Sequence, residues 1–151
     1  MNNVKAISAD LVVYFGNKRI ENKDFLPLSL THREPIFKYN FKSNKYYTFI
    51  IVDPDAPVGY WIHYCIYNIT DKDKGVKYYI YSPPAPPPKT GPKKDGRHRY
   101  YCILYEQEEK IIGKKPILGR DFIDYLEFRN ILGVSLESVA YVAFICKSGE
   151  Y

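Results

Sequence analysis

Residues 46–69 read YYTFIIVDPDAPVGYWIHYCIYNI, in which a proline-containing break separates two apolar runs. Tyr46 to Val52 is rich in aromatic and β-branched residues, which favour a half-buried strand. The run is expected to stop at residues 53–57, DPDAP, because two prolines cannot donate hydrogen bonds to a sheet ladder. Trp61 to Ile69 then resumes the same pattern. The stretch therefore predicts two strands, with two carboxylates at the point where the first one ends.

The rest of the chain predicts more short strands and one late helix. Strand-forming residues fill the ranges 11–15, 77–81, 99–107 and 139–146. In residues 121–132, apolar side chains recur every three or four positions and Gly133 follows, which indicates an amphipathic helix. Several strands and a late helix predict a mainly β protein, an antiparallel β-sandwich that carries one or two short helices.

The composition is that of an ordinary globular domain. The chain has 151 residues, of which 46% are hydrophobic and 26% are charged, and these values argue against disorder. This length fits a single domain over residues 1–151, with no internal repeat or linker. The 16 Tyr and 8 Phe residues favour sheet. The formal net charge of +5 favours anionic lipid surfaces or phosphorylated ligands as partners.

The cysteines and the N-terminus predict a cytoplasmic protein. Cys65, Cys102 and Cys146 lack the spacing of a metal site, and the first two lie in apolar runs where a free thiol acts as a small hydrophobe. Free thiols are typical of a reducing compartment. The segment Met1–Lys5 lacks the apolar core of a signal peptide, and no apolar run approaches the roughly 18 residues of a membrane span.

Alternation of side chains along the strands predicts a cluster of polar groups. One face carries Trp61, His63, Cys65 and Tyr67, and another carries His98, Tyr100, Cys102 and Leu104. Both histidines lie near a strand start and a proline-rich loop, and Asp53 and Asp55 lie near a strand end. If these ends meet, two imidazoles, two carboxylates and a phenol converge on one cavity. Imidazole and phenol groups donate to phosphate oxygens, and a carboxylate orients a histidine or accepts from a ligand ammonium group.

Taken singly, these residues are weak evidence, since a strand histidine is more often structural and an aspartate beside proline is more often a turn former. Their order carries more information. The blocks are DPDAP at 53–57, WIH at 61–63, GRHRY at 96–100 and LYEQ at 104–107. This order and spacing resembles the phosphatidylethanolamine-binding protein (PEBP, Raf kinase inhibitor protein-like) family. Residues 122–132 are similar to a later part of the family more loosely, and the first forty residues match only in general character.

The resemblance implies an antiparallel Greek-key β-sandwich of the PEBP type with an anion pocket, and it implies neither a catalytic residue nor a metal or other cofactor. Carried over by position, the ligand-binding residues are Asp53, Asp55, Pro57, Trp61, His63, Gly96, His98 and Tyr100. The aspartates line the pocket, Pro57 shapes its entrance, Trp61 forms a wall, and the two histidines contact the anion. Either Gly91 or Gly96 takes the role of the loop glycine. The Ala56–Pro57 peptide bond is expected to be cis.

The function that follows is a binding protein for a phosphate or phosphoethanolamine head group, carried by a phospholipid or a phosphorylated ligand. The family's roles imply regulation through a kinase or a serine protease as a partner. Peripheral contact with an anionic membrane is a further expectation, supported by the basic residues of the loop before His98.

Two other functions are weighed against this one. A metal-dependent enzyme could use His63, His98 and an aspartate, but the chain has no H-x-H or H-E-x-x-H spacing. Nucleic-acid binding could use the cluster Lys89, Lys93, Lys94, Arg97 and Arg99. That cluster is short and interrupted by Asp95, which favours a solvated basic loop, so no nucleic-acid partner is predicted.

Overall fold

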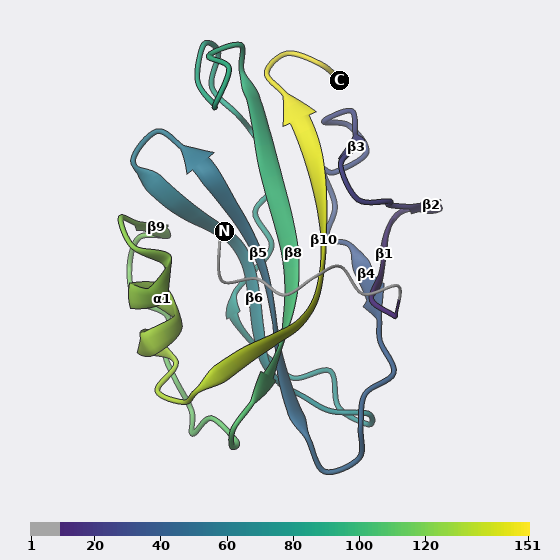
Figure 1. Ribbon diagram of the computed structural model, residues 1–151, viewed down its shortest axis with the longest axis vertical. Coiled ribbons are helices and arrows are strands. Elements are labelled where there is room, and N and C mark those ends of the chain that lie inside the picture. Colours follow the sequence, from purple (N-terminus) through teal and green to yellow (C-terminus); the bar gives the residue numbers. More distant parts are fainter. Residues whose placement is uncertain (1–9) are drawn as a thin grey trace.

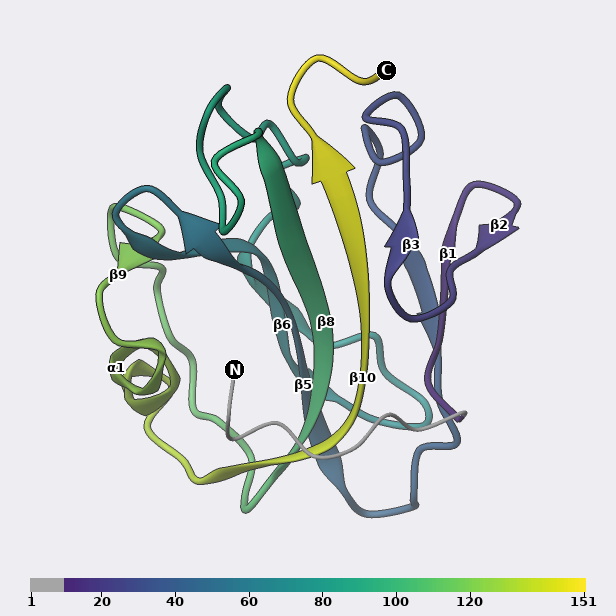
Figure 2. The ribbon, with the colours of Figure 1, turned by 45° about the horizontal axis from the view of Figure 1, so that its top comes forward.

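In the computed structural model, which describes residues 10–151, a large sheet lies between a small sheet and a helix (Figures 1 and 2). The expectation for Met1–Lys5 falls outside the described residues. Figure 2 shows the helix on one side of the long central strands and the small sheet on the other. Among the described residues, no helix is long and apolar enough to cross a membrane.

The small sheet has the strand order β2-β1-β4, and the large sheet has the order β3-β10-β8-β5-β6-β7 with β9 paired to β6. The elements are β1 (Val12–Phe15), β2 (Lys18–Arg19), β3 (Asp24–Phe25), β4 (Ile36–Lys38), β5 (Tyr46–Ala56), β6 (Gly59–Ile69), β7 (Val76–Tyr79), β8 (Arg97–Gln107), β9 (Asp121–Phe122), α1 (Tyr125–Ile131) and β10 (Leu136–Lys147). Neighbouring strands are antiparallel except β3 and β10, which are parallel. The mainly β prediction is confirmed.

Among the predicted element boundaries that the structure changes, those of β5 and of the helix bear on the site. β5 continues through the prolines to Ala56, because the register between β5 and β6 shifts between Asp53 and Ala56 and so leaves Pro54 outside the regular ladder. The predicted helix over residues 121–132 is shorter, since Asp121 and Phe122 pair with β6 instead. The side chain of Asp124 then accepts a hydrogen bond from the Leu126 N–H at 2.9 Å and caps α1.

Two apolar clusters cover the two faces of the large sheet. Side chains that alternate along the sheet pack either against the small sheet or against α1. Along β8, Tyr100, Cys102 and Leu104 belong to the cluster on the small-sheet side. Ile103 and Tyr105 belong to the cluster beneath α1. The predicted shared face of Tyr100, Cys102 and Leu104 is therefore confirmed.

The alternation predicted for β6 is wrong, because β6 contains a bulge. Ile51 pairs with Tyr64, whereas the next residue of β5 pairs with Ile62, so His63 is the extra residue between them. Cys65 and Tyr67 consequently pack under α1, on the face opposite to the one that His63 shares with Tyr100. A bulge of this kind turns a single side chain toward a new neighbour. In this chain it brings His63 to the ring of Tyr100.

Candidate functional site

A cavity of about 380 Å³ lies at the end of the large sheet where the β5–β6 hairpin turns and β8 begins, the upper end in Figure 1. Its other wall is the proline-rich loop that precedes β8. Six of the eight predicted ligand-binding residues line it, namely Asp53, Pro57, Trp61, His63, His98 and Tyr100. The β5–β6 hairpin and the more distant strand β8 thus bring these side chains together, as the motif order predicts.

Asp53 and His98 form a buried pair in the cavity wall. The His98 Nδ1 atom lies 2.6 Å from Asp53 Oδ2, and the two side chains are 1% and 6% exposed. The Asp55 backbone N–H donates to the other carboxyl oxygen of Asp53 at 2.7 Å. Burial raises the pKa of the Asp53 carboxyl above its usual value, although the hydrogen bond to His98 lowers it. The pair therefore holds its ionisable groups within hydrogen-bonding distance and out of bulk water.

The second ring nitrogen of His98 is engaged by Thr90. Its Nε2 atom lies 2.7 Å from Thr90 Oγ1. The Thr90 hydroxyl also lies 2.7 Å from the Pro87 carbonyl, to which it donates. Both nitrogens of His98 are thus hydrogen-bonded within the protein. Thr90 stands outside every sequence motif above, and its loop position eight residues before His98 offers no pattern by which to find it.

His63 is buried and neutral. Its Nδ1–H donates to the Ser82 carbonyl at 2.7 Å, so Nε2 is the unprotonated, accepting nitrogen. Burial is the main cause that lowers the pKa of His63 to about 4; the hydrogen bond to the Ser82 carbonyl opposes this shift, and the Arg120 and His98 side chains contribute to it. The imidazole packs edge-on against Trp61 and Tyr100, with ring centroids at 4.5 and 5.2 Å. At neutral pH, His63 therefore offers the cavity a hydrogen-bond acceptor.

Tyr100 lines the cavity and carries a hydroxyl without a hydrogen-bond partner. The residue is fully buried, and its ring stacks on Phe144 at 5.1 Å. Burial raises the pKa of the Tyr100 hydroxyl far above its usual value, so the group stays protonated. In residues 10–151, only two buried side-chain polar atoms lack a hydrogen-bond partner, and the Tyr100 hydroxyl oxygen is one of them. Such a group costs stability unless a ligand or a water satisfies it.

Asp55 lies outside the cavity lining. Its carboxylate makes a two-pronged ion pair with Arg99, with distances of 2.7 and 2.9 Å, and also accepts the Arg99 backbone N–H at 2.9 Å. These contacts hold the start of β8 against the end of β5. The side chain that the motif places in a pocket thus has a structural partner.

Gly96 also lies outside the lining, and Gly91 is the glycine beside His98. A Cβ atom on Gly91 would lie 2.0 Å from the Arg97 carbonyl oxygen and 3.2 Å from the His98 ring. A Cβ on Gly96 would meet Ser148 instead, at 2.8 Å. Both glycines have positive φ, at 90° and 85°. Close approach to the histidine is therefore the role of Gly91.

The Ala56–Pro57 peptide bond is trans, and the expectation of a cis bond is wrong. Ala56 pairs with Gly59, so Pro57 is the first central residue of a two-residue turn. The φ angle that proline imposes suits that position with a trans bond. Gly59 then allows the turn to approach β9, since a Cβ there would lie 2.5 Å from the Phe122 carbonyl oxygen.

Arg120 supports the Trp61–His63 wall from behind and was missed at the level of the sequence. Its Nη1 donates to the carbonyls of Ile80 and His63, at 2.9 and 3.2 Å. The guanidinium lies 4.9 Å from the ring centroid of Tyr79 and 5.4 Å from that of Trp61. One side chain thus ties β6 to the strand beside it. No motif signals it, because its contacts are about forty to sixty residues away.

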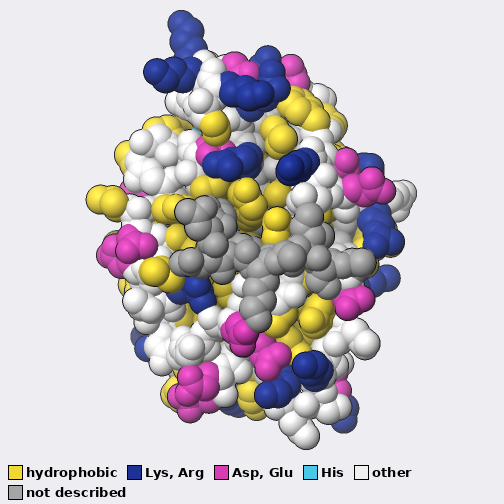
Figure 3. Space-filling model, in the orientation of Figure 1, with side chains coloured by type: hydrophobic (Ala, Val, Ile, Leu, Met, Phe, Trp, Pro, Cys, Tyr) yellow, Lys and Arg dark blue, Asp and Glu magenta, His cyan; other side chains and the backbone are white. Residues whose placement is uncertain are grey.

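The loop that forms one wall of the cavity contains several basic residues. Lys89, Lys93 and Lys94 are exposed, and no described carboxylate pairs with them. Asp95 instead pairs with Arg97 at 2.8 Å. Figure 3 shows Lys and Arg side chains gathered at this end of the molecule. Within the described part of the chain, no group of three or more His, Cys, Asp and Glu side chains is placed to hold a metal ion.

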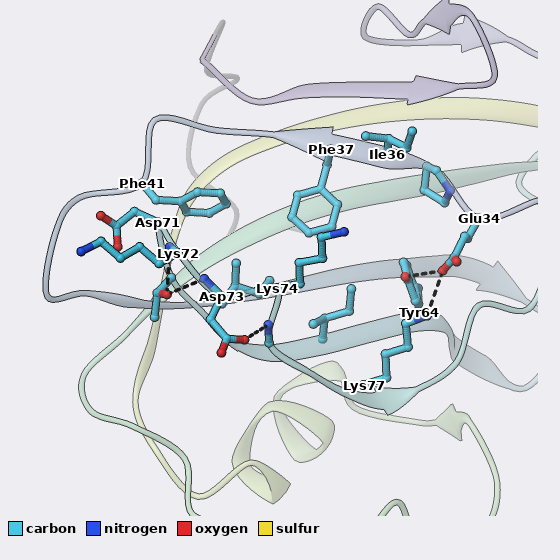
Figure 4. Close-up of a pocket in the computed structure, with 15 residues that line it drawn as sticks. Glu34, Ile36, Phe37, Phe41, Tyr64, Asp71, Lys72, Asp73, Lys74 and Lys77 are labelled. Carbon is cyan, nitrogen blue, oxygen red and sulfur yellow. Dashed lines mark hydrogen bonds and ion pairs between the residues drawn. The ribbon is translucent and has the colours of Figure 1, made fainter.

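A second cavity of about 590 Å³ lies between β4 and the β6–β7 hairpin (Figure 4). Its floor is apolar, and lysines and acidic residues surround its rim. Glu34 accepts hydrogen bonds from the Tyr64 hydroxyl and Lys77, at 2.6 and 3.2 Å. Asp73 accepts from the Gly75 N–H at 2.8 Å. This cavity has none of the unpartnered buried atoms that the first one has.

A family model described as phosphatidylethanolamine-binding protein matches residues 16–136. The rice protein MOTHER of FT and TFL1 homolog 2 is 29% identical over 114 residues, which cover 70% of this chain and 62% of that protein, less than two thirds of its length. The tomato protein SELF-PRUNING is 28% identical over 148 residues, which cover 90% and 79%.

A solved structure is similar as well. The Escherichia coli protein YBCL, described as a new member of the mammalian PEBP family, superposes with a TM-score of 0.60 at 14% identity, over 92% of this chain and 99% of that one. At this identity the likeness concerns the fold. The likeness supports the mainly β fold with one short helix described above. Every residue of the first cavity falls within the matched residues 16–136.

Proposed function

This chain belongs to the phosphatidylethanolamine-binding protein family, and we propose that its first cavity binds a phosphate or phosphoethanolamine head group without covalent chemistry. The observation that carries the proposal is the Tyr100 hydroxyl, a buried and protonated donor with no partner among the described residues. Burying such a donor costs free energy that a ligand oxygen can recover. A phosphoryl oxygen is a strong acceptor, and its charge strengthens the hydrogen bond.

The other polar groups of the cavity suit the same ligand. The Nε2 atom of neutral His63 accepts a hydrogen bond from a protonated phosphate oxygen or from an ammonium group. The exposed Lys89, Lys93 and Lys94 attract anions to the cavity mouth by long-range electrostatics. On this basis, peripheral contact with an anionic membrane is part of the proposal.

Regulatory partners and cellular setting are also proposals. Family membership is the support for a role that works through a kinase or a serine protease. The support for a reducing, cytoplasmic setting is that Cys65, Cys102 and Cys146 are buried free thiols. Labelling of these thiols under denaturing conditions immediately after cell lysis, with and without prior reduction, tests the setting; disulfide-linked forms would contradict it.

Calorimetric titration of the wild-type chain with phosphoethanolamine and with inorganic phosphate tests the proposed ligand. We expect saturable binding of both, and a loss of roughly tenfold to a hundredfold in affinity in Tyr100→Phe, because that variant lacks the free donor. Tyr105→Phe is the matched control, since its hydroxyl is also buried on β8 but bonds to Tyr125 at 2.6 Å. Absence of saturable binding, or equal affinity in Tyr100→Phe, would contradict the proposal.

A further inference from the structure

The hydrogen of the Thr90 hydroxyl points to the Pro87 carbonyl. The Pro87 carbonyl at 2.7 Å can only accept, so the hydroxyl donates to it. The Thr90 oxygen then meets His98 Nε2 at 2.7 Å with its lone pairs. Two acceptors at that distance would repel each other, so the His98 Nε2 atom carries a hydrogen and donates it to Thr90.

The other ring nitrogen of His98, Nδ1, holds or shares a second proton. His98 Nδ1 and Asp53 Oδ2 are 2.6 Å apart, which requires one proton between them. Whichever atom holds this proton, the pair contains two protons in all. It is then either an imidazolium with a carboxylate or a neutral imidazole with a carboxylic acid. In both forms the net charge of the Asp53–His98 pair is zero.

Without the Thr90 oxygen, the number of protons on the Asp53–His98 pair changes. His98 is 1% exposed, so a proton on Nε2 would have neither water nor protein to accept its hydrogen bond. The ring would keep the Nδ1 proton, which the Asp53 carboxylate accepts, and would lose the one on Nε2. The pair would then carry a charge of −1 in the wall of the cavity. A negative wall repels an anion, and more strongly when it is buried than in water.

The loop holds Thr90 firmly at this place. Its neighbours Lys89 and Gly91 both have positive φ, at 62° and 90°. The Thr90 carbonyl accepts the Gly96 N–H at 2.9 Å, and the Gly91 carbonyl accepts the Lys94 N–H at 3.0 Å. The absence of a side chain on Gly91 lets the loop reach the histidine. The positive φ of Lys89, which is uncommon for a residue with a side chain, the glycine at position 91 and two hydrogen bonds thus position one hydroxyl.

We propose that Thr90 is a positioning residue that keeps the Asp53–His98 pair electrically neutral and so lets the cavity accept an anion. Thr90 itself is not among the residues that line the cavity, and both nitrogens of His98 face protein groups. In this arrangement Tyr100 supplies the donor to the ligand, and His98 sets the charge of the wall. The inference rests on the proposed binding of a phosphoryl group.

The test compares wild type, Thr90→Val and Thr90→Ser at pH 7. Nitrogen NMR of the histidine rings reports whether His98 Nε2 carries a proton, and calorimetry with inorganic phosphate reports affinity. We expect a protonated Nε2 in wild type and Thr90→Ser, with equal phosphate affinities. In Thr90→Val we expect Nε2 to lose its proton and the affinity to fall by at least roughly tenfold. Thr70→Val is the control, since its hydroxyl serves a loop turn away from this cavity.

The outcomes separate the two proposals. A wild-type chain that binds no phosphate overturns the proposed function. A wild-type chain that binds phosphate, with a folded Thr90→Val variant that binds it as tightly or more tightly, overturns the role of Thr90 alone. An unprotonated His98 Nε2 in the wild type also overturns it, whatever the affinity. If Thr90→Val does not fold, the NMR signal of the wild type and its comparison with Thr90→Ser still decide the protonation state.

Discussion

The strands β5, β6 and β8 carry a cluster of polar side chains at each end, and the two clusters differ in how well their hydrogen bonds are satisfied. At the end away from the cavity, Gln107 Oε1 accepts from the Thr48 hydroxyl and the Asn68 N–H, both at 2.8 Å. Gln107 Nε2 donates to Asn68 Oδ1 at 2.9 Å, and Asn68 also exchanges two hydrogen bonds with the backbone of Ile111. At the cavity end, the buried Tyr100 hydroxyl has no partner.

The difference indicates separate roles for the two clusters. A fully satisfied buried network stabilises and specifies the fold, and here it ties the segment after β8 to β6. A buried donor without a partner lowers stability in the free protein and gains a bond when a ligand arrives. We therefore expect substitutions at the first cluster to change stability alone. Removal of the unpartnered Tyr100 hydroxyl at the second should change stability and binding in opposite directions.

The largest expected effect is the loss of stability in Asn68→Ala. The change leaves the Ile111 N–H and carbonyl without partners in a buried place, and one hydrogen of the Gln107 amide loses its acceptor while the other still bonds to the Glu109 carbonyl. This costs about 3 kcal/mol or more of unfolding free energy. Urea unfolding measures it, and phosphate affinity should stay unchanged. Asn44→Ala is the control for backbone conformation, because Asn44 also has positive φ but is exposed. Equal losses of unfolding free energy in Asn68→Ala and Asn44→Ala would contradict the stabilising role of the Asn68 side chain.

The next largest effect is a loss of stability at low pH, caused by protonation of His63. Burial lowers its pKa to about 4 from the usual value of 6.5, so the unfolded chain takes up a proton at a higher pH than the folded chain does. The stability that the neutral ring confers is complete above about pH 6.5 and is lost as the pH falls toward 4. The loss amounts to about 3 kcal/mol. Urea unfolding of wild type and His63→Gln at pH 7 and pH 4.5 measures it, and parallel pH profiles would contradict it.

The smallest expected effect is the change in stability when the Tyr100 hydroxyl is removed, and it distinguishes the two clusters most directly. Tyr100→Phe removes the unpartnered hydroxyl and keeps the ring that stacks on Phe144. We expect the free protein to gain about 1 kcal/mol of unfolding free energy, although the variant binds phosphate more weakly. Tyr105→Phe should lose stability instead, since its hydroxyl has a partner in Tyr125. Thermal unfolding of the three proteins without ligand measures this; a less stable Tyr100→Phe would contradict it.

Local motifs predicted much of the fold and most of the cavity wall. The strand propensity of residues 46–52 and 99–107, and the alternation along β8, placed Tyr100 with Cys102 and Leu104 correctly. Asp53 and His98 come from two motif blocks that the fold brings to 2.6 Å. The strands and their alternation depend on residues that are neighbours in the chain, whereas the Asp53–His98 pair was expected from the order of the motif blocks.

What sequence reasoning missed depends on contacts between distant segments. The bulge at His63 arises from the register of β6 against β5, which no periodicity within β6 reveals. Residues 121–122 pair as β9 because the β5–β6 turn offers a free edge, which overrides their helical spacing. Thr90 and Arg120 act through a loop conformation and through carbonyls about forty to sixty residues away. Asp55 matches its motif but pairs with Arg99.

The most direct test of the central claim is a crystal structure of the chain soaked with phosphoethanolamine. We expect a phosphoryl oxygen about 2.5–3.0 Å from the Tyr100 hydroxyl, with the Thr90–His98–Asp53 hydrogen bonds unchanged. Head-group density in the second cavity, beneath Phe37 and Phe41, or an empty first cavity at saturating ligand, would contradict it.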